Sequence, residues 1–331
     1  MSGLTDVPGL RVGHATDAHG LTGCTVILAT DGAVAGVEVR GSAPGTRETD
    51  LLRPTALVER IHAICLSGGS AFGLAAADGV MSWLAEHDIG VETGARRVPI
   101  VPAAVLFDCF LGDAFAAPDA AMGRAAAEAA GEGPVDEGSI GAGTGATVGK
   151  LAGPQAATKG GVGTAGRVLR DGRIIAALAV TNAIGNVVGR DGAILAGARS
   201  PNGGFIEADQ LLGAGESDES IGRFGTNTTL AVIGTNAPLD RAGCQKLAEL
   251  GQDGLAIAIR PVHSMLDGDT VFALSTGAGT PLSGLELLAL GAAATSVMVE
   301  AIERSVLTAR GRGGVPGLAD EADPTGGGTH P

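Results

Sequence analysis

The sequence contains no tyrosine, and seven phenylalanines and one tryptophan are its only aromatic residues. A tyrosine hydroxyl therefore cannot serve as an acid, a base or an oxyanion donor, and few rings are available to stack on nucleobases. Basic residues are also scarce: the chain has 22 lysines and arginines and 36 acidic residues, which gives a net charge of -14. This balance provides no basic surface for a polyanion. We therefore expect neither a nucleic acid nor a membrane as a partner.

The cysteines are few and isolated. Each of the four lies within an apolar stretch, and none forms a Cys-x-x-Cys pair: Cys24, Cys65, Cys109 and Cys244. Neither a disulfide framework nor a zinc site fits this spacing, and the six histidines do not form the i, i+4 pairs of a helical zinc site. We expect no metal or other cofactor. The first residues lack a signal-peptide pattern and no apolar run reaches about 18 residues, so we expect a cytoplasmic protein.

The chain has enough apolar sequence for one large core. It is 331 residues long and 45% hydrophobic, which excludes disorder over most of its length. The 56 glycines follow no Gly-X-Y period, so they are expected to serve turns and close contacts of a folded chain. Near the C-terminus the sequence becomes rich in glycine and loses its periodic pattern. We predict a single domain over residues 1–308 and a disordered tail over residues 309–331.

Hydrophobic patterning predicts groups of strands and helices. Runs of β-branched residues at 24–30 and 33–39 flank Asp31-Gly32, a strong signal for a two-residue hairpin turn. Further strands are expected at 63–67, 173–181, 193–196, 228–234 and 270–275, and helices at 70–87, 119–130, 240–251 and 281–307, the last broken or bent near Gly291. Residues 138–163 are expected to form loops lining a cleft, and residues 207–220 a further loop. Paired strands with helices between and after them indicate an α+β fold of two sheets flanked by helices.

Lysine is rare in this chain. Only three lysines occur, and two of them, Lys150 and Lys159, lie in the glycine-dense segment. The segment is not a phosphate-binding loop, because Thr144 and Leu151 stand where the Walker A pattern needs a glycine and a serine or threonine. An amine can lose its proton or place a compact charge near a developing oxyanion. Both lysines are therefore candidate catalytic residues, and a solvated surface lysine is the alternative interpretation of each.

Two polar segments lead directly into buried strands. Thr226-Asn227-Thr228-Thr229 leads into the strand expected at 228–234, and Asp267-Gly268-Asp269 precedes the strand expected at 270–275. Two carboxylates at i and i+2 can hold an ammonium group and orient a hydroxyl. A calcium-binding turn or a plain turn is the alternative interpretation of the aspartate pair.

Several motifs occur in the order found in one peptidase family. They are Val98-Pro-Ile-Val-Pro102, Lys159-Gly-Gly-Val-Gly-Thr164, Asn227-Thr-Thr-Leu-Ala-Val-Ile-Gly-Thr-Asn236 and Arg260-Pro-Val-His-Ser-Met-Leu-Asp-Gly-Asp269. Over roughly residues 8–308 the chain resembles the family of the L-aminopeptidase D-amidase/D-esterase, and most closely its nylon-oligomer (6-aminohexanoate oligomer) hydrolase branch. The resemblance implies a four-layer α/β/β/α sandwich, shared with ornithine acetyltransferase. It also implies a homo-oligomer, a tetramer or larger.

The resemblance further implies an N-terminal nucleophile hydrolase, which is made as one inactive chain and cuts itself. In this sequence the cut falls between Asn227 and Thr228 and yields residues 1–227 and 228–331. Thr228 Oγ would attack the Asn227 carbonyl, the acyl group would shift from nitrogen to oxygen, and water would release the ester. The new α-amine of Thr228, with a reference pKa of about 7.7 to 8.0, could then deprotonate its own hydroxyl.

The family pattern also implies how the nucleophile is held. Asp267 and Asp269 would hold and orient the threonine, and Lys150 would lie beside it. Lys159 is the competing lysine, and its glycine-rich surroundings favour a role in supporting a loop. We therefore expect Lys150 to be the catalytic lysine.

Two further residues are implied on the substrate side of the reaction. Asn182 would donate its side-chain amide to the oxyanion, with Asn186 as the competing asparagine. Phe107 stands where the family has a tyrosine whose hydroxyl helps at the reaction centre. We expect Phe107 to contact the substrate. Either Asn182 and backbone amides suffice without that hydroxyl, or the activity is slower or shifted in substrate.

Three functions are compatible with these features. The first is a self-cleaving threonine hydrolase of amide bonds in small linear substrates with a free amino end, such as short peptides, β-peptides or aminohexanoate oligomers. The second is an acyltransferase on the same fold, in which an amine instead of water accepts the acyl group. The third is a relative that cleaves nothing and binds a ligand. The mass of the purified chain and its products with and without an amine acceptor would separate the three.

Overall fold

The computed structural model describes residues 3–213 and 227–322, and every structural statement below concerns these residues. The main sheet follows the order β10-β11-β14-β16-β2-β4-β7-β3, with β1 paired to β2. Its strands are β1 (Arg11–Asp17), β2 (Thr22–Val39), β3 (Gly45–Arg47), β4 (Arg60–Ser67), β7 (Ala103–Val105), β10 (Val162–Val168), β11 (Ile174–Asn182), β14 (Thr228–Thr235) and β16 (Thr270–Ser275).

The remaining elements comprise small sheets and helices. The small sheets are β5 (Val91–Glu92) with β6 (Arg97–Val98), β8 (Thr147–Val148) with β9 (Thr158–Lys159), and β12 (Asn186–Val188) between β13 (Ile194–Ala196) and β15 (Ile259–Arg260). The α-helices are α1 (Ala76–Glu86), α2 (Ala120–Glu128), α3 (Ala208–Gly213), α4 (Arg241–Ala258), α5 (Gly284–Leu307) and α6 (Leu318–Ala322). The 3-10 helices are η1 (Leu4–Asp6), η2 (Thr49–Leu52), η3 (Ser70–Ala75), η4 (Gly141–Gly143), η5 (Lys150–Ala152) and η6 (Pro154–Ala156).

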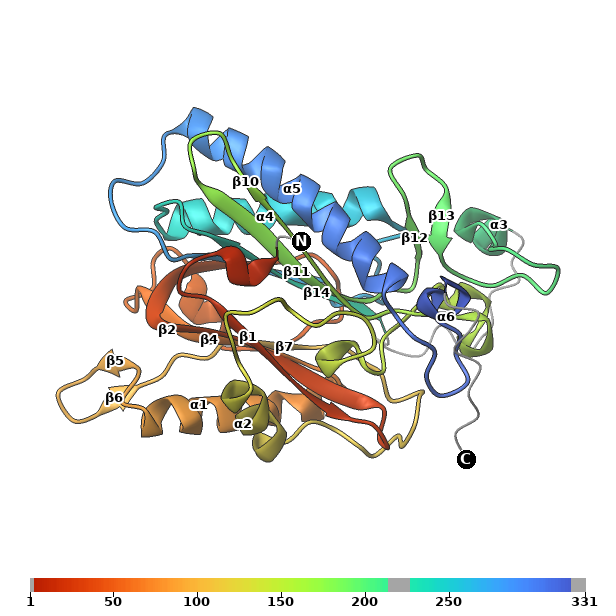
Figure 1. The fold of residues 1–331 in the computed structure, drawn as a ribbon, viewed down its shortest axis with the longest axis horizontal. Coiled ribbons are helices and arrows are strands. Elements are labelled where there is room, and N and C mark those ends of the chain that lie inside the picture. Colours follow the sequence, from red (N-terminus) through yellow and green to blue (C-terminus); the bar gives the residue numbers. More distant parts are fainter. Residues whose placement is uncertain (1–2, 214–226, 323–331) are drawn as a thin grey trace.

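The elements stack in four layers (Figure 1). Helices α4 and α5 cover β10, β11, β14 and β16, the strands β1, β2, β4 and β7 form the next layer, and α1 and α2 cover its outer face. Three clusters of buried apolar side chains fill the three interfaces. Alternation along β14 assigns Ala231 and Ile233 to the helix side, and Leu230 and Val232 to the core between strand layers. The predicted α/β/β/α sandwich is confirmed.

Strand β2 connects the two strand layers. Its first half pairs with β1 and β4, and its second half pairs with β16. The pairing with β4 shifts register between Leu28 and Ala33, and Gly32 has a φ of 79°. The predicted hairpin at Asp31-Gly32 is therefore wrong, because the two predicted strands form one strand with a bulge. A glycine with positive φ serves a bulge as well as it serves a turn.

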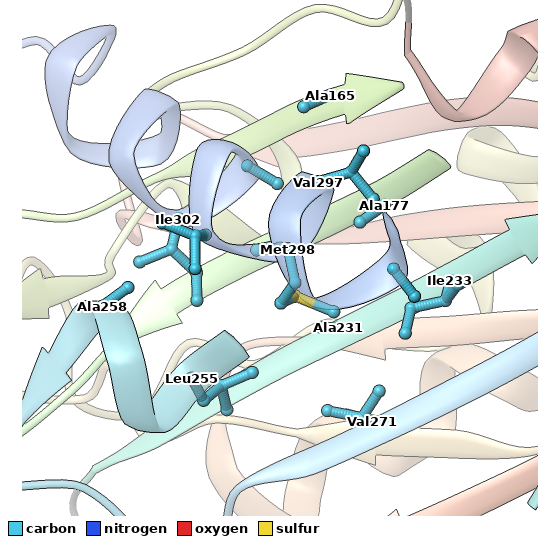
Figure 2. Packing of buried hydrophobic residues seen from close by; sticks show 14 of the residues in the cluster. Ala165, Ala177, Ala231, Ile233, Leu255, Ala258, Val271, Val297, Met298 and Ile302 are labelled. Carbon is cyan, nitrogen blue, oxygen red and sulfur yellow. The ribbon is translucent and has the colours of Figure 1, made fainter. Parts of the chain in front are cut away.

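Helix α5 is continuous, so the predicted break near Gly291 is wrong. A Cβ at Gly291 would come within 2.2 Å of Leu250 Cδ1, which indicates that the glycine allows α4 to pack closely. Figure 2 shows Met298 and Ile302 of α5 lying among small residues of the sheet, such as Ala231. The helix is long and apolar enough to cross a membrane, but its buried face packs against α4, β10 and β11, as in the core helix of a globular domain.

The C-terminal segment is folded at least to residue 322, so the prediction of disorder from residue 309 is wrong for residues 309–322. The carbonyl of Pro316 accepts a hydrogen bond of 2.9 Å from Lys159 N, and Val315 is buried beside Leu111 and Ala157. Gly313 and Gly314, with φ of 57° and 80°, reverse the chain here. Residues 323–331 lie outside the described part of the chain.

Most of the other predicted elements are confirmed, with shifted ends. The helix predicted at 240–251 continues to Ala258, and the strands predicted at 173–181 and 228–234 correspond to β11 and β14. Residues 207–220 were expected to form a loop, but α3 covers Ala208–Gly213. Residues 214–220 lie outside the described ranges.

Candidate active site

The Asn227-Thr228 junction lies at the start of β14, a central strand of the main sheet. Thr228 is paired with Asn182 at the end of β11. Opposite residues of an antiparallel pair point to the same face, so these two side chains lie side by side. They share the face of Leu230 and Val180, which belongs to the core between the strand layers. The site therefore lies at one end of that core.

The carbonyl between Asn227 and Thr228 is bound on its oxygen by two donors. The Thr228 hydroxyl donates to it, and Gly268 N donates to it over 3.0 Å. Both junction residues are buried, with 1% and 2% of their surface exposed. A carbonyl that accepts two hydrogen bonds in a dry environment is polarised, and Gly268 N–H is in position to stabilise the negative charge of a tetrahedral intermediate.

Gly268 contacts the Asn227-Thr228 junction, and the sequence alone did not single it out. A Cβ at this position would lie 2.7 Å from Thr228 Oγ1 and 2.6 Å from the Ala43 carbonyl oxygen. The backbone of the Asp267-Gly268-Asp269 segment can therefore approach the hydroxyl only because residue 268 has no side chain. The glycine between two aspartates is the sequence signal for this close approach.

The two aspartates hold the segments around the junction. Asp269 accepts hydrogen bonds from Thr229 N at 2.7 Å and from His263 N and Nδ1 at 3.1 and 2.9 Å. Asp267 accepts from Ser264 N at 2.9 Å and Ser264 Oγ at 2.5 Å. Burial, followed by the negative charge of Asp269, raises the pKa of Asp267. Within residues 3–213 and 227–322, no group of three His, Cys, Asp or Glu side chains could hold a metal ion.

Lys150 and Asn182 are brought together beside Thr228. Lys150 Nζ donates to the Asn182 carbonyl at 3.0 Å and to Asn182 Oδ1 at 2.8 Å, and Thr147 N donates to the same Oδ1 at 3.0 Å. Burial lowers the pKa of Lys150 to about 7, although the charge of Asp267 opposes the shift. An amine with this pKa exists in both protonation states near neutral pH, which suits proton transfer.

Lys159, the competing lysine, has different partners. It is fully buried, and its Nζ donates to the carbonyls of Thr144 and Ala146 at 2.8 and 2.5 Å. Burial lowers its pKa to about 7, opposed by Asp108. These bonds fix the loop that leads to Thr147, the residue that binds Asn182. The geometry makes Lys159 a support of the site and puts Lys150 in contact with the residue opposite Thr228.

Asn186, the competing asparagine, lies in a separate small sheet. Its Nδ2 donates to the Ile206 carbonyl at 2.8 Å, and its Oδ1 accepts from Ala198 N at 3.1 Å. These bonds hold residues 198–206 against β12. Asn182 is thus the asparagine opposite Thr228, whereas the side chain of Asn186 holds neighbouring backbone.

Phe107 connects the site to a cavity. Its carbonyl accepts a hydrogen bond of 2.9 Å from Asn182 Nδ2, which leaves the second N–H of that amide for another acceptor. Its ring is partly buried, lies 5.1 Å from the ring of Phe110 and lines a cavity of about 680 Å³. The residue predicted to contact the substrate is therefore at the edge of both the nucleophile site and an open space.

A comparison with protein families gives a match to one described as peptidase family S58, over residues 2–319. The chain belongs to peptidase family S58. An uncharacterized aminopeptidase of Mycobacterium tuberculosis is 42% identical to this S58 peptidase, over 97% of this chain and 98% of that protein. The 6-aminohexanoate-oligomer endohydrolase of Paenarthrobacter ureafaciens is 33% identical, over 90% of this chain and 84% of that protein. The resemblance inferred from the motifs is confirmed, and the family assigns amide-bond hydrolysis to this chain.

Solved structures give the same fold. A β-aminopeptidase of a Burkholderia species matches with a TM-score of 0.73 and 24% identity, covering 99% of this chain and 95% of that one. The L-aminopeptidase D-Ala-esterase/amidase of Ochrobactrum anthropi, described as a variant of the Ntn hydrolase fold, matches with a TM-score of 0.73 and 20% identity, covering 95% and 88%. At these identities the matches establish the fold of the S58 peptidase and nothing finer.

The buried lysines predict how the stability of this S58 peptidase depends on pH. Lys150 and Lys159 have a pKa of about 7 when folded and about 10.5 when exposed, so between these values the unfolded chain binds more protons. The free energy of unfolding should therefore rise from pH 7 to pH 8.5, by up to about 1.4 kcal/mol per pH unit for each lysine. Urea unfolding of the Thr228→Ala chain at both pH values measures this slope. Lys150→Met in the same background should reduce this pH dependence of the free energy of unfolding. An unchanged slope would contradict a lowered pKa of Lys150 in the folded chain.

Proposed function

We propose that this S58 peptidase cuts itself between Asn227 and Thr228 and then hydrolyses amide bonds with Thr228 as its N-terminal nucleophile. The observation that carries the proposal is the Asn227 carbonyl, whose oxygen is bound by the Thr228 hydroxyl and by Gly268 N–H in a buried site. A hydroxyl next to its own polarised carbonyl is arranged for an N-to-O acyl shift.

The cut proceeds in two steps. Thr228 Oγ forms a bond to the Asn227 carbonyl carbon, the C–N bond breaks, and the nitrogen takes up a proton to become the free α-amine of Thr228. Water then hydrolyses the ester, which leaves a carboxylate on Asn227 and restores the hydroxyl. Gly268 N–H stabilises the oxyanion of the first step. In the mature enzyme, the α-amine accepts the hydroxyl proton as Thr228 attacks a substrate.

The neighbouring residues then have distinct roles. Lys150, with its lowered pKa, lies against Asn182 and exchanges protons or stabilises negative charge near the nucleophile. Asn182 donates the N–H that Phe107 does not use to the oxyanion of the substrate. Asp267 and Asp269 hold the backbone that carries Gly268 and orient the new ammonium group of Thr228.

The substrates we propose are small linear amides with a free amino end, such as short peptides, β-peptides or aminohexanoate oligomers. The aminopeptidase and oligomer-hydrolase names of the relatives support this class. Acyl transfer to an amine acceptor is the second candidate, because both reactions pass through the same acyl-threonine. Product analysis with a small amine in excess separates them, since a transferase forms the new amide in preference to the free acid.

We also propose that the protein acts in the cytoplasm as a homo-oligomer, a tetramer or larger. Its four cysteines are free and three of them are buried, which is consistent with a reducing compartment. Leu285 and Leu288 are exposed to 80% and 62%, so apolar surface outside the site is available for contacts between subunits. Sedimentation of the purified protein measures the assembly directly.

The purified protein should consist of two fragments. By simple proportion of the 32.4 kDa chain, residues 1–227 and 228–331 have masses of about 22 and about 10 kDa. Intact-mass spectrometry after incubation at neutral pH measures both, and the smaller fragment should begin at Thr228. A chain that keeps its full mass after prolonged incubation would contradict self-cleavage and favour the ligand-binding alternative.

A further inference from the structure

Phenylalanines are concentrated around the cavity that Phe107 lines. Four of the seven in the chain lie there, namely Phe72, Phe107, Phe110 and Phe115. Phe110 and Phe115 expose 55% and 97% of their surface, in a protein whose other aromatic residues are few. Exposed rings gathered around a hollow indicate a surface that binds something apolar.

Among the described residues, no carboxylate, amine, guanidinium or imidazole group lines the cavity. Beside the phenylalanines it is formed by alanines, Gly69, Ser70 and Cys109. Asp108, which lies between two lining residues in sequence, is buried and faces away, because its carboxylate accepts hydrogen bonds from Gly69 N and Thr22 Oγ1 at 2.7 and 2.8 Å. A charged group entering the cavity would therefore lose water without gaining an ion pair.

The cavity is connected to Thr228 by a chain of contacts that begins at Phe107. Phe107 lines the cavity, the carbonyl of Phe107 accepts a hydrogen bond from Asn182, and Asn182 is paired with Thr228. A volume of about 680 Å³ lies within the range of sites for small molecules, about 300 to 1,000 Å³. A substrate bound at Thr228 could thus extend one of its groups into this space.

We propose that the cavity binds an apolar group of the substrate, of the size of a phenyl ring or a short methylene chain, and so selects apolar over polar and charged amides. The proposal rests on the proposed function, and it names the part of the substrate that the enzyme recognises. Concavity and the link through Phe107 favour the substrate as occupant over a second copy of the chain, which would fit a flatter surface.

The test compares substrates that differ only in one side chain. The first series is the p-nitroanilides of glycine, alanine, phenylalanine and lysine, and the second is dipeptides of alanine followed by the same residues. We expect kcat/KM for phenylalanine to exceed that for glycine by about 10- to 100-fold in at least one series. Phe110→Ala should reduce this preference by about 10-fold, and Phe110→Glu should shift it toward lysine.

Control variants distinguish an effect on substrate preference from a general loss of self-cleavage or hydrolysis. Leu57→Ala removes an exposed apolar side chain that does not line the cavity and should leave the preference unchanged. All variants should cut themselves and hydrolyse the alanyl-glycine dipeptide, which has no large apolar group, at the wild-type rate. A failure of the proposed function would instead appear as no turnover of any substrate. An unchanged preference in Phe110→Ala and Phe110→Glu would overturn the proposal. If the substrate preference were unchanged and the Phe110 variants also sedimented as smaller assemblies than the wild type, the cavity would be a contact between subunits instead.

Discussion

Thr228→Ala is expected to leave the chain uncut at its full 331 residues and to abolish amide hydrolysis. Only the residue after the scissile bond can make the acyl shift, and the same hydroxyl would be the nucleophile toward substrate. The loss should be on the order of 10³-fold or more, as for removal of other catalytic nucleophiles. Intact mass and turnover of a small aminoacyl amide measure the two effects.

Thr229→Ala is the matched control. Thr229 is adjacent in sequence, but β14 turns its side chain to the opposite face, and its buried Oγ1 makes no hydrogen bond within the described part of the chain. The variant should fold, cut itself and retain activity, because only its backbone N–H binds Asp269. Self-cleavage in Thr228→Ala, or its loss in Thr229→Ala, would move the nucleophile to another residue.

Gly268→Ala is expected to slow self-cleavage by about 10²-fold, because displacement of a reacting group by about 1 Å has an effect of this size. The new Cβ would lie 2.7 Å from Thr228 Oγ1 and 2.6 Å from the Ala43 carbonyl oxygen, so either the hydroxyl or the Gly268 backbone must move. Both movements disturb the two hydrogen bonds to the Asn227 carbonyl. A time course of uncut chain after synthesis measures the rate.

Gly133→Ala provides the control for the glycine substitution. A Cβ at Gly133 meets no atom within 4 Å and its φ is not positive, so the variant should cut at the wild-type rate. If Gly268→Ala also cut normally while its melting temperature stayed unchanged, the close approach of the segment to Thr228 would have no role in the reaction.

The sequence was sufficient to predict strands and helices that are encoded by neighbouring residues. β14 and β16 were predicted from short apolar runs, and the site from polar residues immediately before them. The hairpin at Asp31-Gly32 failed because a bulge uses the same glycine conformation as a turn, and only pairing with β16 decides between them. The folded C-terminal segment was missed because the burial of Val315 depends on residues far away in sequence.

The choice between the two lysines required three-dimensional contacts. Both are buried, and in both cases burial lowers the pKa to about 7, so neither composition nor environment separates them. What differs is the partner: Lys150 reaches Asn182, whereas Lys159 reaches backbone carbonyls of its own segment. Gly268 was missed for a related reason, since a backbone donor leaves no distinctive side chain in the sequence.

The order of the main sheet has a consequence for the two fragments. β14 and β16, which belong to residues 228–331, lie between β11 and β2, which belong to residues 1–227. A cut at Asn227 therefore frees a chain end but leaves each fragment hydrogen-bonded to the other along both sides of a central strand pair. If the chain cuts itself as proposed, its folding is unimolecular before the cut and bimolecular after it. The two fragments would stay together in the native enzyme. After full unfolding they would have to find each other again, so the yield of refolding would depend on protein concentration, unlike that of the uncut chain.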